Sequence, residues 1–205
     1  MDVVGERWTL LIIRDLLLGP WRYSDLQSRN PGITTNLLAK RLNEMEETGL
    51  IQKQKQSSVG SPHVYELTEL GRKLEPAVLA LGQFGFNFMT KGPEPGDQLD
   101  PGRALLNLKK RYLGKSEGAM AFEFINMPCA EEVIPYIVKY DPDYVDIRYG
   151  QSSFQSTKAT LSLKTYGDLV FRGGSAQELE EKGGLTITGE RKIWEKTLSA
   201  FGLNK

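Results

Sequence analysis

The amino-acid sequence predicts a mainly α-helical domain with one β-hairpin, followed by an α+β domain in which helices cover a sheet. Before residue 91, apolar side chains mostly follow helical spacing, interrupted by two short polar strands. Residues 91–97 (KGPEPGD) then combine two prolines with two glycines, which is typical of a linker. After this break, apolar and polar residues alternate, as in half-buried strands. We therefore expect domains at 1–91 and 99–205, joined by a linker at 92–98.

The composition is that of an ordinary globular protein. The chain has 205 residues, 40% of them hydrophobic and 25% charged, enough for one large or two small domains. Residues 1–91 carry 11 basic and 10 acidic side chains, so net charge does not favour a nucleic-acid partner. No stretch approaches the roughly 18 apolar residues of a membrane span, and no secretory signal opens the chain. The single cysteine, Cys129, suits a reducing compartment, so we expect a cytoplasmic protein without membrane insertion.

The first helix is expected from about Val3 to Leu18, where Gly19 and Pro20 end it. It has two apolar stripes, so it must be buried twice. The second burial is either against a partner or within the same core. The stripes are Val4, Trp8, Ile12 and Leu16 on one side, and Leu10, Ile13 and Leu17 on the other.

Two further helices are expected on either side of an Asn-Pro-Gly turn at residues 30–32. The second helix begins at Ser24, with Gln27 at capping-box spacing. Thr34 is expected to cap the third helix, and Gly49 to end it in a Schellman-type turn. The inward face of the third helix consists of Leu38, Leu42 and Met45.

Two short strands, Gln52–Gln56 and His63–Leu67, are expected around a loop of turn residues. Thr68 then caps a long helix in which Pro76 produces a bend. Its apolar residues repeat at steps of four and three, as in a coiled-coil seam: Leu70, Leu74, Ala77, Leu81, Phe84 and Phe88. One small domain cannot easily bury this seam, so we expect a dimer interface; packing against the second domain is the alternative.

This order of helices and hairpin is that of a winged helix-turn-helix, in which the third helix enters the DNA major groove and the hairpin lies along the backbone. Asparagine can bridge adenine, lysine can contact guanine or phosphate, and threonine can reach either bases or phosphates. The expected DNA contacts are Thr34, Thr35, Asn36, Lys40 and Asn43 on the helix, and Lys53, Lys55 and His63 on the hairpin. The alternative is a merely solvated polar face. Arg41 lies beside the buried face and is expected to be structural.

Four segments carry a family resemblance: 5–16 (GERWTLLIIRDL), 19–26 (GPWRYSDL), 31–51, and 65–71 (YELTELG). In order and spacing they resemble the HxlR-type regulators, which are relatives of the MarR group. The resemblance covers nearly all of residues 1–90. It implies a transcription regulator that binds a palindromic operator in double-stranded DNA as a homodimer, with the third helix as reader and the hairpin as wing.

One feature of that family has no counterpart here. Many members carry a cysteine just before the first helix and use it to sense oxidants or electrophiles. This sequence starts inside that helix and has no cysteine in residues 1–91. Either a preceding segment is missing or the protein does not sense in this way. Cys129 is expected to be an ordinary small residue, and DNA binding by this chain to be indifferent to mild oxidants.

In the second domain, Asp100 and Pro101 are expected to start a helix that runs through Tyr112. Strands are expected around Met120–Phe124, Val145–Tyr149, Leu161–Leu163, Leu169–Phe171 and Leu185–Ile187. A short helix at Gln177–Glu181 and a final helix with Trp194, Leu198 and Phe201 complete the domain.

The last third of this domain resembles the end of a sterol carrier protein type-2 domain. The resemblance rests on Asp168–Phe171, a Gly173-Gly174 turn, a short helix, residues 184–189 (GLTITG) and a closing helix. It implies a cavity for a small hydrophobic ligand, which would act as effector. The domain is short for that family, which puts the size of the cavity in doubt. A hydrophobic-ligand module as the main activity and a purely structural domain are the alternatives.

Enzymatic function is not expected. One histidine and one cysteine cannot form a multidentate metal cluster of the usual spacing. The glycine pairs at 173–174 and 183–184 lack the context of a phosphate-binding loop. Residues 150–154 (GQSSF) lack the glycine that a nucleophile elbow has two residues after the serine. We therefore expect no catalytic residues, no metal and no cofactor.

Overall fold

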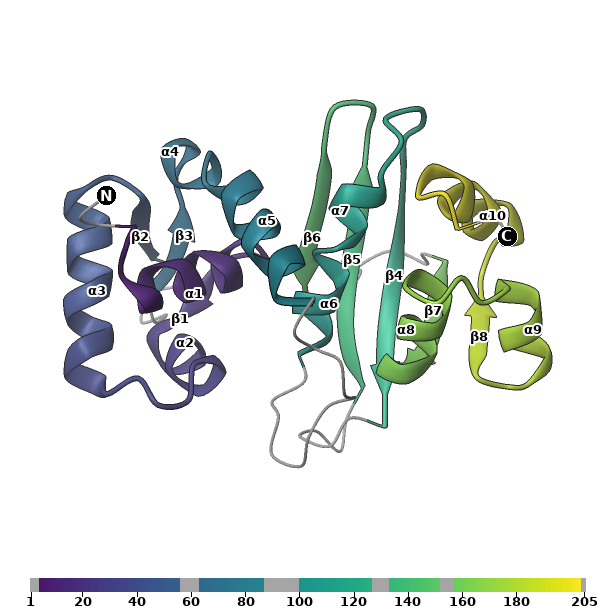
Figure 1. Ribbon diagram of the computed structural model, residues 1–205, viewed down its shortest axis with the longest axis horizontal. Helices are drawn as coiled ribbons and strands as arrows, with labels where there is room; N and C mark the ends of the chain where they lie inside the picture. The colour runs from purple at the N-terminus through teal and green to yellow at the C-terminus, as the bar shows by residue number, and fades with distance from the viewer. Residues whose placement is uncertain (1–3, 56–62, 87–99, 127–132, 152–156, 204–205) are drawn as a thin grey trace. The chain divides into compact units, whose positions relative to one another are not determined.

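The computed structural model describes residues 4–55, 63–86, 100–126, 133–151 and 157–203 (Figure 1). The chain divides into two compact units, Met1–Gly92 and Pro93–Lys205, and each is described by itself. The expected linker at 92–98 lies outside the described residues, as does Cys129.

Three helices form the core of the first unit: α1 (Arg7–Leu16), α2 (Tyr23–Arg29) and α3 (Thr35–Glu47). α1 is shorter than expected at both ends: it begins at Arg7 instead of about Val3, and the turn that leads to Pro20 already begins at Leu17. Both of its apolar stripes are buried within this unit at Ile12 and Leu16, and at Ile13 and Leu17. The stripe residues toward its N-terminus, such as Trp8 and Leu10, are half-exposed. The apolar residues of the C-terminal half of α1 are therefore ordinary core.

The predicted start of α2 was wrong. Arg22 is the N-cap, and its backbone N–H donates to Oδ2 of Asp25 at 3.1 Å. The pair Ser24 and Gln27 does not form the capping box, because the carboxylate of Asp25, three residues after Arg22, reaches back to the backbone instead.

Both predicted ends of α3 are confirmed. Oγ1 of Thr34 accepts from the backbone N–H of Leu37 at 3.3 Å. At the other end, Gly49 has φ +71°, and the N–H of Leu50 donates to the carbonyl of Met45 at 2.9 Å. These are the bonds of a Schellman motif, in which glycine adopts the left-handed conformation.

A three-stranded sheet takes the place of the expected two-stranded hairpin. β2 (Ile51–Lys55) and β3 (His63–Leu67) are antiparallel, and β1 (Trp21–Arg22) pairs with the other edge of β3. The indole N–H of Trp21 donates to the carbonyl of Asp15 in α1 at 2.9 Å. This bond ties the sheet to the helical core. The expected loop at 57–62 lies outside the described residues.

The single long helix expected after Thr68 is two helices, α4 (Glu69–Arg72) and α5 (Glu75–Phe86). Pro76 lies in the first turn of α5, where its missing N–H leaves no helical bond unmade. The chain therefore breaks before Pro76 instead of bending at it.

Thr68 caps α4 as predicted: its Oγ1 accepts from the N–H of Gly71 at 3.1 Å. Gly71 packs closely on the turn that enters β2, since a Cβ placed on it would lie 2.0 Å from the carbonyl oxygen of Leu50. Only glycine allows this approach.

The second unit is built on a five-stranded mixed sheet. Its strands are β4 (Gly118–Ile125), β5 (Ile134–Tyr140), β6 (Val145–Tyr149), β7 (Lys158–Ser162) and β8 (Leu185–Thr188). The order across the sheet is β6-β5-β4-β7-β8, and only β4 and β7 are parallel.

Helices pack on one face of this sheet (Figure 1). They are α6 (Pro101–Leu105), α7 (Leu108–Arg111), α8 (Leu163–Val170), α9 (Ala176–Glu181) and α10 (Arg191–Ala200). The ring of Tyr166 in α8 meets those of Phe122 and Phe124 in β4. Phe201, just after α10, meets Tyr140 of β5, whose register places it on the same face of the sheet. The apolar core lies between this face and the helices.

Three predictions in this unit were wrong. Leu169 and Val170 belong to α8 rather than to a strand, because together with Tyr166 they form a buried helical face. For the same reason β7 ends at Ser162, before Leu163. The helix expected through Tyr112 is divided into α6 and α7, although Asp100 does cap its start by accepting from the N–H of Arg103.

Candidate nucleic-acid interface

The five α3 residues predicted to contact DNA are all exposed. Asn36, Lys40 and Asn43 follow one another at steps of four and three, so they share one face of the helix. The opposite face, Leu38, Leu42 and Met45, is buried in the core. Thr34 and Thr35 lie at the beginning of the same helix and are exposed as well. The structure thus brings these five side chains together.

Lys40 and Arg41 differ in how firmly they are held. Nζ of Lys40 lies 3.9 Å from Oε1 of Glu44; the Lys40 side chain is exposed and that of Glu44 is half-buried. Such a surface pair contributes little, so Lys40 is available to a phosphate or a base. The half-buried guanidinium of Arg41 contacts Oε2 of Glu6 at 3.1 Å and Oε2 of Glu44 at 2.6 Å. As expected, Arg41 has a structural role, bridging α3 to the segment before α1.

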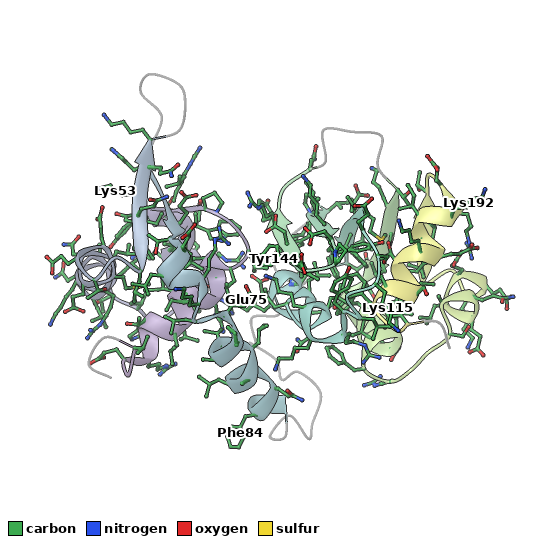
Figure 2. All side chains as sticks on the ribbon, turned by 90° about the horizontal axis from the view of Figure 1, so that it is seen from above. Lys53, Glu75, Phe84, Lys115, Tyr144 and Lys192 are labelled. Carbon is green, nitrogen blue, oxygen red and sulfur yellow. The ribbon has the colours of Figure 1, made fainter. Side chains whose placement is uncertain are left out.

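The three predicted wing residues share one face of the β2–β3 pair. Lys55 stands opposite His63 in the register, and Lys53 stands opposite Tyr65. All three predicted residues are exposed, and Nζ of Lys53 lies 5.8 Å from the centre of the Tyr65 ring (Figure 2). Nothing in the described structure brings His63 to α3.

The one carboxylate among the described residues of β2 and β3 is on the other face of this pair. Oε1 of Glu66 accepts from the side-chain amides of Gln52, at 2.5 Å, and Gln54. Lys53 and Lys55 therefore present positive charge from a face on which the described strand residues carry no acid.

Sequence reasoning missed two residues that hold the start of α3. The hydroxyl of Tyr23 donates to the backbone carbonyl of Thr35 at 2.7 Å, and Nε2 of Gln27 donates to Oγ1 of Thr35 at 2.9 Å. Tyr23 and Gln27 are four residues apart on α2, a spacing that places them on one face. This spacing could have indicated that Tyr23 and Gln27 act together. Nothing in the sequence showed which part of α3 this face of α2 would contact.

A buried polar cluster supports the turn between α2 and α3. Asp15 is fully buried, and Asn30 donates to its Oδ2 at 2.8 Å and to the carbonyl of Leu26 at 2.9 Å. The guanidinium of Arg29 lies 4.3 Å from the centre of the Trp21 ring. These contacts join α1, β1 and the end of α2 next to the turn that leads to α3.

α5 carries large apolar side chains that are more than half exposed. Leu81 is 54% exposed and Phe84 is 61% exposed (Figure 2), as is Leu70 of α4 at 51%. Ala77, on the same seam, is exposed too. The last residue of the predicted seam, Phe88, lies outside the described residues.

In the described part of the chain, no group of three or more His, Cys, Asp or Glu side chains could hold a metal ion. None of the helices that the structure describes is both long and apolar enough to cross a membrane.

Comparison with known proteins gives matches to transcriptional regulators. Residues 3–93 match the family model described as HxlR-like helix-turn-helix. An uncharacterized HTH-type transcriptional regulator of Mycobacterium bovis is 40% identical over 95 residues, which are 46% of this chain and 60% of that protein. The HTH-type regulator YkvN of Bacillus subtilis, also uncharacterized, is 36% identical over 84 residues, 41% of this chain and 71% of YkvN.

Among solved structures, the reduced form of the transcriptional regulator YodB from B. subtilis matches with 29% identity and a TM-score of 0.39, over 45% of this chain and 90% of that one. The chain spans only 60% of the length of the M. bovis relative and of a similar regulator of Mycobacterium tuberculosis. The family match itself ends at residue 93.

Proposed function

This chain belongs to the HxlR-like helix-turn-helix family, and from that premise we propose that it is a DNA-binding transcription regulator that acts as a homodimer on a palindromic operator. The observation that carries the proposal is α3. It offers Thr35, Asn36, Lys40 and Asn43 to solvent on a helix whose opposite face is fully buried. A helix held in this way can enter the major groove and present its polar face to base edges.

The proposed roles divide between the helix and the wing. Asn36 and Asn43 are base readers, because an asparagine amide can bond both N6 and N7 of adenine. Lys40, Thr34 and Thr35 contact bases or phosphates from the same helix. Lys53, Lys55 and His63 contact the phosphate backbone, which adds affinity but no sequence preference. These three share one face of the wing, which supports a single docking direction.

The proposed dimer places two such helices on one DNA molecule. The exposed apolar side chains of α5 support it, since large apolar groups in contiguous exposed patches usually mark an interface. Two-fold symmetry of the dimer requires two half-sites in the operator, about one helical turn apart. α1 contributes less to this interface than its two stripes indicate, since most of their residues are buried in the unit's own core.

The test is selection of binding sites from random DNA by the purified full chain, followed by mobility shifts on the selected site and on the DNA upstream of the protein's own gene. The expected result is a two-fold symmetric site whose half-sites are about 10 base pairs apart. Genome-wide mapping of bound sites would then identify the target genes. Binding without any sequence preference would contradict the proposal.

We also propose that the second unit is an effector domain, of sterol-carrier type, for a small hydrophobic molecule. Aromatic rings from one face of its sheet and from α8 with its C-cap form a continuous layer between sheet and helix. In that layer the rings of Tyr149, Tyr136, Phe124, Tyr166 and Phe171 each contact the next, from the exposed Tyr149 to the exposed Phe171. The exposed rings at its two ends, Tyr149 and Phe171, offer apolar surface to a flat or aliphatic ligand.

The effector role is tested by titrating fatty acids, sterols and aromatic hydrophobes against the full chain on its operator. A ligand shifts DNA binding only by its differential affinity for two arrangements of the protein, and such coupling is typically about 1–3 kcal/mol. Mass spectrometry of native preparations would show a ligand carried through purification. If no compound binds, and deletion of residues 98–205 leaves DNA affinity unchanged, the unit is structural. If a ligand binds without affecting DNA binding, a hydrophobic-ligand module is the better description.

A further inference from the structure

Two hydrogen bonds from α2 converge on Thr35, the first residue of α3. Tyr23 binds its backbone carbonyl and Gln27 binds its side-chain oxygen, over 2.7 and 2.9 Å. The first bond fixes the position of the backbone at the start of α3. The bond from Gln27 does not involve the backbone; it is made to the hydroxyl oxygen of Thr35, an exposed residue.

The bond from Gln27 determines what the Thr35 hydroxyl can still do. A hydroxyl has one proton to donate and two lone pairs that can accept. The amide nitrogen of Gln27 can only donate, so it occupies one lone pair of Oγ1 and leaves the proton and the second lone pair unused. Within the described part of the chain, Oγ1 of Thr35 makes no other hydrogen bond. The hydroxyl proton is therefore available for an acceptor outside the protein.

We infer that Gln27 is a positioning residue that keeps the hydroxyl proton of Thr35 free, and that Thr35 donates this proton to an acceptor on DNA. The inference rests on the proposed function and adds to it the polarity of one contact. The acceptor is either a phosphate oxygen or a base acceptor in the major groove. Guanine, adenine and thymine offer such acceptors there, whereas cytosine presents only its N4 donor. If the acceptor is a base, this donation favours guanine, adenine or thymine over cytosine at one position of each half-site.

The test reverses the polarity of this hydroxyl. In Gln27→Glu the carboxylate accepts the hydroxyl proton, so Oγ1 of Thr35 becomes an acceptor toward DNA. Gln27→Met keeps the length of the side chain without a hydrogen bond, and Thr35→Val removes the hydroxyl at nearly constant volume. The double variant Gln27→Glu with Thr35→Val measures the added negative charge alone. Each variant is assayed as the full chain, by titration on the selected operator and by renewed selection from random DNA.

The expected result for Thr35→Val is about three- to tenfold weaker binding to the operator, the loss of one hydrogen bond. If the acceptor is a base, Gln27→Glu moves the preference at one position per half-site to cytosine, or to adenine through its N6 donor. If the acceptor is a phosphate, Gln27→Glu weakens binding to all sequences alike, and by more than it does in the Thr35→Val background. Gln27→Met relaxes the same contact without reversing it.

Two results would overturn the inference. One is a Thr35→Val protein that binds with the affinity and the site preference of the unsubstituted protein. The other is an equal effect of Gln27→Glu with and without the Thr35 hydroxyl, since the change would then be charge repulsion only. Thermal midpoints of all variants separate these results from unfolding, and Tyr23→Phe controls for loss of the backbone bond. Failure of the proposed function is distinct: the unsubstituted protein would then select no sequence.

Discussion

The side-chain amide of Asn30 donates to the fully buried carboxylate of Asp15 at 2.8 Å, and this bond joins the end of α2 to α1. Asn30 is itself buried and also bonds the carbonyl of Leu26. Removing the amide would leave a buried charge with fewer partners, which costs more than the bond itself contributes. The turn that orients the reading helix therefore depends on this pair.

Asn30→Ala is expected to lower the free energy of unfolding by about 1–3 kcal/mol. Urea denaturation followed by tryptophan fluorescence checks this, because Trp21 lies in the same cluster. The matched control is Ser28→Ala on the exposed side of α2, which should change stability by less than about 0.5 kcal/mol. Equal effects of the two substitutions would show that the cluster is not a support for the turn.

Phe84→Lys is expected to convert the dimer to monomer at micromolar concentration, since a charge in an apolar interface must be desolvated without a partner. Light scattering of the full chain measures this directly. Gln83→Lys introduces the same charge one residue away from the seam and is expected to leave a dimer. An unsubstituted protein that scatters as a monomer under these conditions would contradict the dimer and the symmetric operator together.

Asn36→Ala is expected to weaken binding to the operator by roughly 1–3 kcal/mol and to relax sequence preference at one position of each half-site. Site selection with the variant measures the preference, and titration measures the affinity. Its control is Glu47→Ala, an exposed residue at the far end of α3. An unchanged preference with Asn36→Ala would remove this residue from the reading surface.

Lys53→Ala and Lys55→Ala are expected to weaken binding to every sequence alike and to reduce the slope of log affinity against log salt by about 1 each. The reason is that each lysine releases counterions from a phosphate. Lys73→Ala, at the C-cap of α4, removes the same charge from an exposed site outside the wing and should leave the slope unchanged. Altered sequence preference in the wing variants, with none in Asn36→Ala, would reverse the assigned roles.

Burial raises the pKa of Tyr166 far above its usual value, and the nearby charge of Arg111 offsets only part of this. Because the pKa in the folded state exceeds the unfolded value of about 10, the stabilisation from this residue is complete below pH 10 and is lost as the pH rises above it. Tyr166→Phe loses the hydrogen bond to the carbonyl of Ala104, worth about 1 kcal/mol at pH 8. The difference in unfolding free energy between the unsubstituted protein and Tyr166→Phe should shrink above pH 10 and vanish near pH 11.

Urea denaturation between pH 8 and pH 11 measures this difference for the second unit. Phe122→Leu provides a control in the same core without an ionisable group, and its deficit should not depend on pH through this residue. A deficit of Tyr166→Phe that is constant across the range would mean that the hydroxyl is not held in a desolvated place.

The parts predicted correctly from the sequence are those fixed by neighbouring residues. The ends of α3 depend on Thr34 and Gly49, each of which acts within a few residues of its own position. The exposure of Asn36, Lys40 and Asn43 follows from the spacing of the buried leucines on the same helix. Such local relations can be read without knowledge of the fold.

The parts that were missed depend on contacts between distant segments. β1 has two residues and exists only because β3 lies beside it. The bond from Gln27 to Thr35 needs the angle between α2 and α3, which no spacing gives. β5 was missed although Ile134–Tyr140 is rich in β-branched and aromatic residues. In α8, a short apolar run fits a strand as well as a helix, and only its packing decides between them.

Gly71 limits which amino-acid substitutions this chain can accept in evolution. At this position even a methyl group would overlap the carbonyl oxygen of Leu50, a backbone atom that cannot turn aside as a side chain would. Relief would require α4 to lift from the turn that enters β2, and Thr68 would then lose its bonds to the carbonyls of Gly49 and Leu50. The exposed residues around it, such as Glu69 and Lys73, are under no such restriction. Substitutions are thus tolerated at the exposed positions of this segment but not at residue 71. A library with all amino acids at residue 71, selected for folded protein, should recover glycine alone.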